Sequence, residues 1–468
     1  MYYDNFFKLC GYSEEEIKKE QPRIDKTFKN WGIAEADVKH AEERIQKYYA
    51  TQFEGVRKLI GVWMKEFICL TLAREECRKV IYSEWPGSAN ILLMGMNRAA
   101  PDCYFGSPAS QTVNMVMGSF FDKLTPILEA GEEHGLTPGK AHCALWLTHT
   151  GIIAKGLIPK PDLLVSAGWL CDIAGECDAM VEQMFDIPTV FMDGCIDWQN
   201  DDFPWIGDKQ VKYAGAQLRK VKERIEEVIG VKVSDEILNA GNGDMGKLFF
   251  NYQTLLQLVG KADPLPIAMT NLDLAYAMFY TPLKYRAEAD QAIMTLVREV
   301  KPLVDQGKGV LPKGAPKVYC LIRNYVDPSI SWMLHECGLN PCVMMADYLL
   351  PTCIPRIAEA GRTDPCELMV EGVYRIGQLV IQGSGPADYI PRCCEDFKVD
   401  GCIIAYPFNC RLGSVVFALK KPLAAMGIPT LVVEADEYDT RQYSAAALRT
   451  RVEAFTELLK AKKEGVLV

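Results

Sequence analysis

The sequence lacks the features that bring proteins to nucleic acids or membranes. Its 468 residues have a net charge of −10 with no compensating basic stripe, which excludes electrostatic capture of nucleic acid. The longest apolar runs, such as residues 163–168 and 402–407, are far shorter than the roughly 18 residues that span a bilayer. The first residues, MYYDNFFKLC, have neither a basic segment nor a long apolar one, so we expect no signal peptide. A cytoplasmic location without nucleic acid or membrane partners follows.

Cofactor motifs with close spacing are also missing. There is no CxxC pair and no run of four nearby cysteines, which excludes an electron-transfer ferredoxin motif. There is no GxxxxGK[ST] sequence, so ATP is not expected to bind this chain. Yet the chain contains 17 cysteines, an odd and high number. In a reducing compartment, metal or redox chemistry explains so many cysteines better than disulfide bonds do.

Composition and length predict a globular chain of several domains. Hydrophobic residues make up 49% and charged residues 24% of the 468 residues, which is ordinary for folded proteins but too long for one domain. Apolar residues recur at helical spacing within 56–70 and predict a helical cap over residues 1–85. Residues 86–207 and 315–468 are assigned to two α/β domains. Residues 208–314 are assigned to a helical segment, with Ser234 as an N-cap.

Short apolar runs alternate with amphipathic stretches in both α/β segments. In the first, we expect strands at 91–95, 163–167 and 189–193, with helices at 111–130 and 172–185. In the second, we expect strands at 317–322, 342–346, 401–405 and 430–434, with helices at 329–337, 367–381, 411–425 and 445–463. Such alternation is typical of parallel sheets with right-handed crossovers. The predicted fold is therefore α/β, with two Rossmann-like parallel-sheet domains.

The two α/β segments contain a short repeat. PDLLVSAGWLCD (161–172) leads through a predicted helix to DIPTVFMD, and VDGCIIAYPFNC (399–410) leads through another to GIPTLVVEAD. In each copy a cysteine follows a strand, at Cys171 and at Cys410. These cysteines are placed just beyond the carboxyl ends of parallel strands, where open α/β sheets bind their ligands.

A third cysteine, Cys143, lies 28 residues before Cys171. Three thiolates that converge from distant parts of the fold would leave one iron of a [4Fe–4S] cluster without a cysteine. That iron could bind substrate, as the open position of a catalytic zinc site does. The alternative is that the three cysteines are small buried hydrophobic residues. Spacing alone leaves both interpretations open.

Longer segments around these cysteines are similar to a known family. HCALWLTHTGIIAKGLIPKPDLLVSAGWLCD (142–172), GVKVSDEIL, VDGCIIAYPFNC, GIPTLVVEADEYDTRQYS and LRTRVEAFTELL resemble, in this order, segments of 2-hydroxyacyl-CoA dehydratase and benzoyl-CoA reductase subunits. The resemblance covers roughly residues 141–459. AKG (154–156) and GKGVLPKG (307–314) most resemble an iron–sulfur subunit of the ATP-dependent benzoyl-CoA reductases. The family's Pro-x-Glu signature is not found within 85–106, so the resemblance does not identify the substrate.

The resemblance implies a cofactor, partners and a reaction. Cys143, Cys171 and Cys410 match the cysteines that hold the family's [4Fe–4S] cluster. A separate iron–sulfur activator hydrolyses ATP and supplies a low-potential electron, and the partner subunit is homologous or a second copy. The electron is used to dehydrate a 2-hydroxyacyl-CoA through a ketyl radical, or to reduce an aromatic acyl-CoA. Two other functions stay open: an electron-relay subunit without its own substrate, and a reductase of small molecules with a double-cubane cluster.

Four further residues are weaker candidates for the site. Cys393 and Cys394 form an adjacent pair that could supply additional ligands, although one buried and one half-exposed cysteine on a helix are the commoner explanation. His142 and His149 flank Cys143 and could donate protons or hydrogen-bond a cluster sulfur. Histidines satisfied at a helix end are the alternative. The acidic run EADEYD (434–439) is assigned a structural role, and Cys69 is assigned to core packing.

Overall fold

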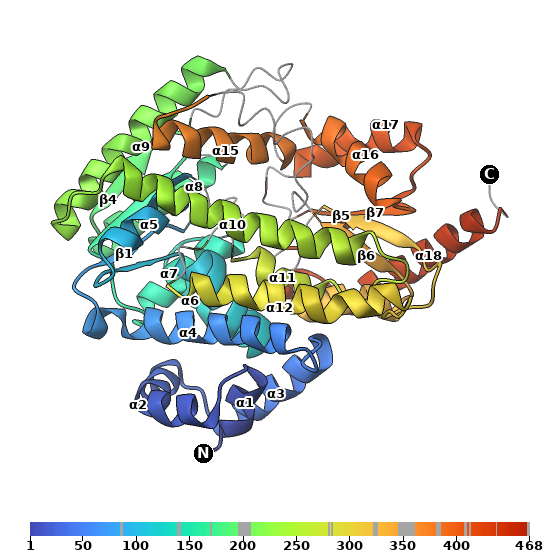
Figure 1. Ribbon diagram of the computed structural model, residues 1–468, viewed down its shortest axis with the longest axis horizontal. Helices are drawn as coiled ribbons and strands as arrows, with labels where there is room; N and C mark the ends of the chain where they lie inside the picture. Colours follow the sequence, from blue (N-terminus) through green and yellow to red (C-terminus); the bar gives the residue numbers. More distant parts are fainter. Residues whose placement is uncertain are drawn as a thin grey trace.

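The chain forms two α/β halves that are joined by long helices and flanked by an N-terminal group of helices (Figure 1). It is known from a computed structural model. The structure describes residues 1–84, 88–137, 142–168, 171–194, 207–278, 281, 284–321, 326–344, 361–380, 385–406, 410, 413–436 and 438–465. Within these ranges, no helix is long and apolar enough to cross a membrane.

Four helices occupy residues 4–76 of the predicted helical cap, whereas residues 80–82, at the end of that predicted cap, form a strand of the first sheet. The helices are α1 (Asp4–Leu9), α2 (Glu14–Trp31), α3 (Glu35–Tyr48) and α4 (Glu54–Glu76). Ser13 and Glu16 form a reciprocal capping box that fixes the start of α2. In α4, a buried face that includes Val56, Trp63 and Phe67 packs these helices onto the rest of the molecule, and α1–α3 lie below α4 in Figure 1.

The first sheet has four parallel strands in the order β2-β1-β3-β4. The strands are β1 (Val80–Tyr82), β2 (Tyr104–Gly106), β3 (Leu163–Ala167) and β4 (Thr189–Met192). The helices between them are α5 (Ser88–Ala99), η1 (Pro108–Phe120), α6 (Thr125–Glu133), α7 (Ala144–Ala154) and α8 (Asp172–Phe185). β3 and α8 have the predicted bounds. β3 is buried along its whole length, as expected for a parallel strand covered by helices on both faces.

The strand predicted at 91–95 is wrong, because these residues belong to helix α5. Ile91, Leu92 and Leu93 are all buried, since α5 packs against both β2 and α10. A short apolar run does not distinguish a strand from a helix that is buried on most sides. The strands of this part of the sheet are instead β1 and β2, which the sequence interpretation missed.

Every regular element that the structure describes in the middle segment is a helix. It comprises α9 (Asp208–Ile229), α10 (Asp235–Gly260), α11 (Thr270–Tyr276) and α12 (Arg286–Asp305). Ser234 caps α10, as predicted, with its hydroxyl accepting the N–H of Ile237. The helical character predicted for this segment is therefore confirmed.

The second sheet repeats the topology of the first, in the order β6-β5-β7-β8, again all parallel. Its strands are β5 (Lys317–Cys320), β6 (Asn340–Met344), β7 (Gly401–Tyr406) and β8 (Thr430–Glu434). Its helices are α13 (Pro328–Glu336), α15 (Pro365–Val380), α16 (Gly385–Phe397), α17 (Gly413–Ala425) and α18 (Ala445–Lys463). Two parallel sheets confirm the predicted α/β class, and their shared strand order confirms that the sequence repeat is structural.

Helix α10 runs past both halves in Figure 1 and is in backbone contact with each. A Cβ atom added to Gly241 would lie 2.7 Å from the backbone nitrogen of Gly95 in α5. One added to Gly260 would overlap the carbonyl oxygen of Cys342 in β6. Glycine is therefore required at both ends of α10 for this close packing.

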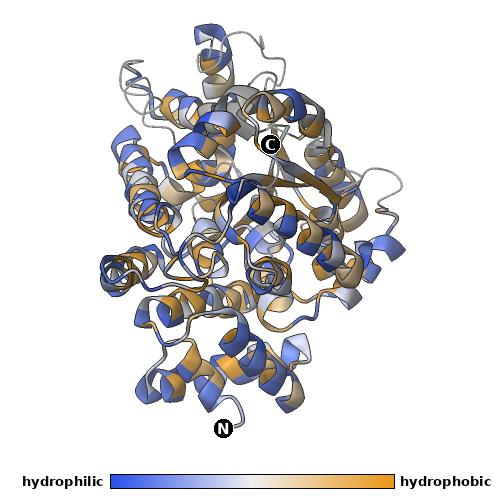
Figure 2. Cartoon of the chain, turned by 90° about the vertical axis from the view of Figure 1, so that its right-hand side faces the viewer, coloured by the Kyte–Doolittle hydropathy of each residue, from blue (hydrophilic) through white to orange (hydrophobic). Residues whose placement is uncertain are grey.

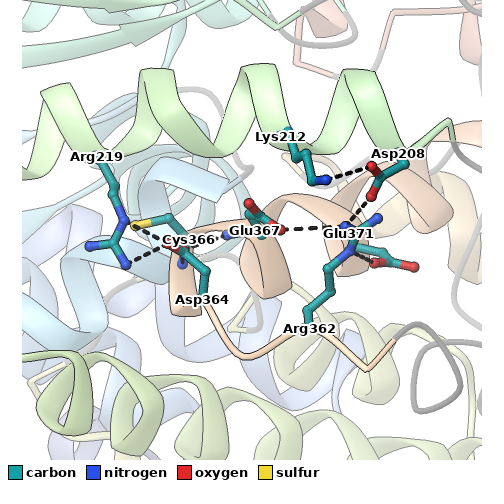
Figure 3. A network of polar contacts seen from close by, with 8 residues as sticks. All are labelled: Asp208, Lys212, Arg219, Arg362, Asp364, Cys366, Glu367 and Glu371. Carbon is teal, nitrogen blue, oxygen red and sulfur yellow. Dashed lines mark hydrogen bonds and ion pairs between the residues drawn. The ribbon is translucent and has the colours of Figure 1, made fainter.

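Helix α15 follows β6 in the chain but packs against α9 and α5 of the other half. Figure 3 shows the polar contacts between α9 and the start of α15: Arg362 donates to Glu371 at 2.7 Å and to Asp208 at 2.5 Å, and Arg219 donates to Asp364 at 2.7 Å. On the inner side, Met369 and Val370 are buried with the apolar residues of α9. The two halves are thus interlocked.

The apolar residues gather inside both halves. In Figure 2 the strands are mostly orange and lie behind helices whose outer faces are blue. One large core includes residues of the N-terminal helices and both sheets, and a second core lies between the first sheet and α5, α9 and α15. These cores leave the carboxyl ends of the strands as the place where polar and cysteine side chains gather.

Candidate functional site

Two of the three predicted cysteines lie at helix N-termini. Cys143 is the N-cap of α7, and Cys171, four residues beyond β3, is the N-cap of α8. Cys410 follows β7 at the place in the second sheet that Cys171 has in the first. All three cysteines are half-buried, and they pack against the main core.

The structure brings these cysteines to one place. Burial raises the pKa of the Cys143 thiol well above its ordinary value of 9.0, and negative charge on Cys171, Asp436 and Cys410 raises it further. Cys171 and Cys410 therefore lie within electrostatic range of Cys143, although they come from different sheets and are 239 residues apart in the sequence.

The donor set fits an iron–sulfur cluster. Thiolate sulfur is the preferred ligand of iron–sulfur centres. The N-termini of α7 and α8 supply unpaired N–H groups and a positive end of the helix dipole, which favour thiolates and an anionic cluster. Among the residues that the structure describes, no three His, Cys, Asp or Glu side chains are grouped tightly enough for a single metal ion. A cubane [4Fe–4S] cluster does not need such a tight group, because each cysteine binds a different iron atom.

The two predicted histidines have different surroundings. His142 is buried, and its Nδ1 accepts the N–H of Thr137 at 3.0 Å, as expected for a histidine satisfied at a helix end. His149 lies inside α7, fully buried, with its ring stacked on Trp146 at 5.7 Å between centroids. Its Nδ1 atom is 3.3 Å from Glu84 Oε1. Burial lowers the pKa of His149 to about 3, so the imidazole is neutral.

The adjacent pair Cys393–Cys394 lies in a different group of cysteines. Both side chains are buried on α16 against the second sheet, and the sulfur atoms of Cys394 and Cys402 are 3.6 Å apart. Burial and then the neighbouring Cys394 and Cys342 raise the pKa of Cys393. The pair thus contacts the cysteines of β6 and β7, and a ligand role for it stays a prediction.

Two acidic residues near the cysteines were not predicted as site residues. Asp436 follows β8, and its Oδ1 accepts the N–H groups of Tyr438 and Asp439, so the structural role assigned to EADEYD describes this loop correctly. Burial raises its pKa to about 6, and it also acts on Cys143. Glu84 follows β1 and contacts His149. Glu84 was not predicted because the sequence interpretation missed β1, the strand that Glu84 follows.

The fold and site define a class of protein: two topologically equivalent parallel α/β halves with a cysteine centre contributed by both. Residues 110–459, about three quarters of the chain, match the family model of the 2-hydroxyglutaryl-CoA dehydratase D-component. The chain therefore belongs to this family of 2-hydroxyacyl-CoA dehydratase subunits.

Two characterised relatives are similar to this chain. The alpha subunit of (R)-2-hydroxyglutaryl-CoA dehydratase from Acidaminococcus fermentans is 22% identical over 322 residues, which is 66% of this chain and 62% of that subunit. The alpha subunit of (R)-2-hydroxyisocaproyl-CoA dehydratase from Clostridioides difficile is 21% identical over 352 residues, 69% of this chain and 78% of that subunit. The chain thus spans less than two thirds of the first relative's length.

Proposed function

We propose that this chain is the iron–sulfur subunit of a 2-hydroxyacyl-CoA dehydratase, an oxygen-sensitive lyase that works with a second subunit and an ATP-hydrolysing activator. The observation that carries the proposal is the convergence of Cys143, Cys171 and Cys410 from both halves. The family match over these cysteines and the names of the two relatives, both alpha subunits of such dehydratases, support it.

The chain's own residues would hold and shield the centre. Cys143, Cys171 and Cys410 would bind a [4Fe–4S] cluster and leave one iron free for the substrate. When bound, the cluster would supply a low-potential electron to the thioester carbonyl of a 2-hydroxyacyl-CoA, which makes loss of the hydroxyl group feasible. The apolar core around the three thiols would exclude water, as low-potential chemistry requires.

Metal analysis of the full chain purified without oxygen tests the cluster. We expect about four irons and four sulfides per chain, and loss of most of this iron in Cys143→Ala, Cys171→Ala and Cys410→Ala. Cys69→Ala is the matched control, because Cys69 is also buried in the main core but contacts Arg23 and Tyr285 instead. An iron-free protein, or equal losses in the control, would contradict the proposal. About eight irons would indicate the double-cubane cluster.

Turnover separates the dehydratase from its alternatives. With the activator, ATP and a reductant, the complete complex should convert a 2-hydroxyacyl-CoA to the 2-enoyl-CoA and leave benzoyl-CoA unchanged. Reduction of benzoyl-CoA instead would assign the chain to the benzoyl-CoA reductase branch. Binding of a CoA thioester by the loaded chain, seen as a change in the cluster's spectrum, is expected of a catalytic subunit and would not occur in an electron relay.

A further inference from the structure

Behind the three cysteines lies a group of buried ionisable residues for which the proposed function gives no role. Glu84 follows β1, His149 is in the middle of α7, and Asp178 is in α8. None of them is more than 1% exposed. Burying three ionisable side chains together is costly unless they share charge or protons.

Glu84 is placed to carry a negative charge. Both of its carboxylate oxygens accept the backbone N–H of Ala109, at 2.9 and 3.1 Å. Ala109 is in the first turn of η1, a helix of 13 residues, so the carboxylate lies at the positive end of a helix dipole. His149 Nδ1 lies 3.3 Å from Glu84 Oε1, close enough for the two groups to share a proton.

Asp178 is placed to carry a proton. Burial raises its pKa well above the ordinary value of 3.8, and the charge of Glu84 raises it further. Two carboxyl groups that share a buried site do not both ionise near neutral pH. Asp178 is therefore a neutral acid, Glu84 the anion, and His149 a neutral base beside the anion.

Several polar atoms around this group have no hydrogen-bond partner among the described residues. They include both ring nitrogens of His149, both carboxyl oxygens of Asp178, and the hydroxyl oxygens of Ser166 and Thr150. Buried polar atoms are almost always paired with protein groups or with internal water. Such water would connect the three residues and let a proton move between them.

Two members of the group are on the helices that begin at Cys143 and Cys171. His149 is six residues beyond Cys143, and Asp178 is seven residues beyond Cys171, which places each about 10 Å along its helix from the cysteine. One added negative charge at the cysteines raises the pKa of the buried Glu84–His149 pair, which titrates as a unit. The titratable neighbours Tyr82 and Cys177 stay neutral, because burial raises the pKa of each.

We propose that Glu84, His149 and Asp178 form a buried proton site that takes up one proton from solvent when one electron reaches the cluster on Cys143, Cys171 and Cys410. The inference rests on the proposed function for that cluster. The electron comes from a low-potential one-electron donor, the proton is held between Glu84 Oε1 and His149 Nδ1, and no other bond forms or breaks. The site thereby offsets the added negative charge and stabilises the reduced state.

The midpoint potential of the cluster, measured at several pH values in the iron-loaded protein, tests this coupling. We expect the potential to fall as pH rises in the unmodified protein, and Glu84→Gln and His149→Gln each to lose at least half of this slope. His335→Gln is the matched control. His335 in α13 is likewise buried and neutral beside a tryptophan, with both ring nitrogens unpaired among the described residues, but no described carboxylate forms an ion pair with it.

A pH-independent potential in the unmodified protein, or an unchanged slope in both variants, would overturn the proposal.

The protonated state of Asp178 is tested separately in iron-free protein by infrared spectroscopy at neutral pH. A carboxylic acid carbonyl band that disappears in Asp178→Asn is expected, and its absence from the unmodified protein would overturn the assignment. A chain that binds no cluster would defeat the proposed function and the coupling together, whereas a loaded chain with a flat potential defeats the coupling alone.

Discussion

Replacing Gly151 with alanine should destabilise the folded chain by about 3 kcal/mol and reduce the iron that it holds. Helices α6 and α7 are in backbone contact through two glycines. A Cβ atom on Gly151 would overlap the carbonyl oxygen of Ile127, and one on Gly131 would overlap that of Leu147. Backbone atoms cannot yield as a flexible side chain can, so the helices must separate. Because α7 begins at Cys143, its displacement also moves a proposed cluster ligand.

The measurement is urea unfolding of Gly151→Ala, together with iron per chain after anaerobic purification. Gly246→Ala is the control: Gly246 is inside α10, and a Cβ atom there would have no heavy atom within 4 Å. Alanine should stabilise that position by about 0.5–1 kcal/mol, because it favours the helix more than glycine does. Equal stability of the two variants would show that α6 and α7 are not held by this close packing.

The stability of the chain should fall between about pH 4.5 and pH 7 because of one buried carboxyl group. Glu66 in α4 is 2% exposed and accepts the backbone N–H of Tyr285 at 3.0 Å. Burial raises its pKa from 4.5 to about 7, against the opposing effect of that hydrogen bond. In this window the folded chain therefore binds more protons than the unfolded chain, and the free energy of unfolding decreases as pH rises, by about 3 kcal/mol.

Glu66→Gln keeps an oxygen for the backbone N–H and removes the charge. We expect it to increase the free energy of unfolding at pH 8 by about 3 kcal/mol and to remove most of this group's pH dependence. Its effect at pH 4 should be small, since Glu66 is then protonated in both states. Glu457→Gln, at an exposed position of α18, should change neither. Equal effects of Glu66→Gln at both pH values would show that the pKa of Glu66 is the same in the folded and the unfolded chain, and would contradict this prediction.

The sequence predicts most of the second half because its strands are long, apolar and bounded by turn residues. The strand at 430–434 and the helix at 445–463 have the predicted bounds, as does the helix at 172–185 in the first half. β1 and β2 were missed because each has three residues, too few for a periodicity. The run at 91–95 was misassigned because tertiary contacts, which no local pattern contains, bury it on α5.

Part of the candidate site could also be predicted, because a local sequence pattern marks two of its cysteines. Cys171 and Cys410 are marked by the repeat that precedes them, and each follows the third strand of equivalent sheets. No sequence repeat points to Glu84 or Asp178. Their importance depends on contacts between residues that are distant in the sequence, Glu84 with His149 and Asp178 with Glu84, which only the folded chain brings together.

Helix α10 has a consequence for how a substrate could reach the cysteines. Two-domain enzymes commonly close around a ligand by rotation about a hinge. Here a single helix of 26 residues is in backbone contact with α5 near Gly241 and with β6 at Gly260, so a rotation of one half against the other would have to break tightly packed contacts. The two halves are therefore held at a fixed separation. Room for a ligand has to come from loops and side chains at the rim, while Cys171 and Cys410 keep their separation.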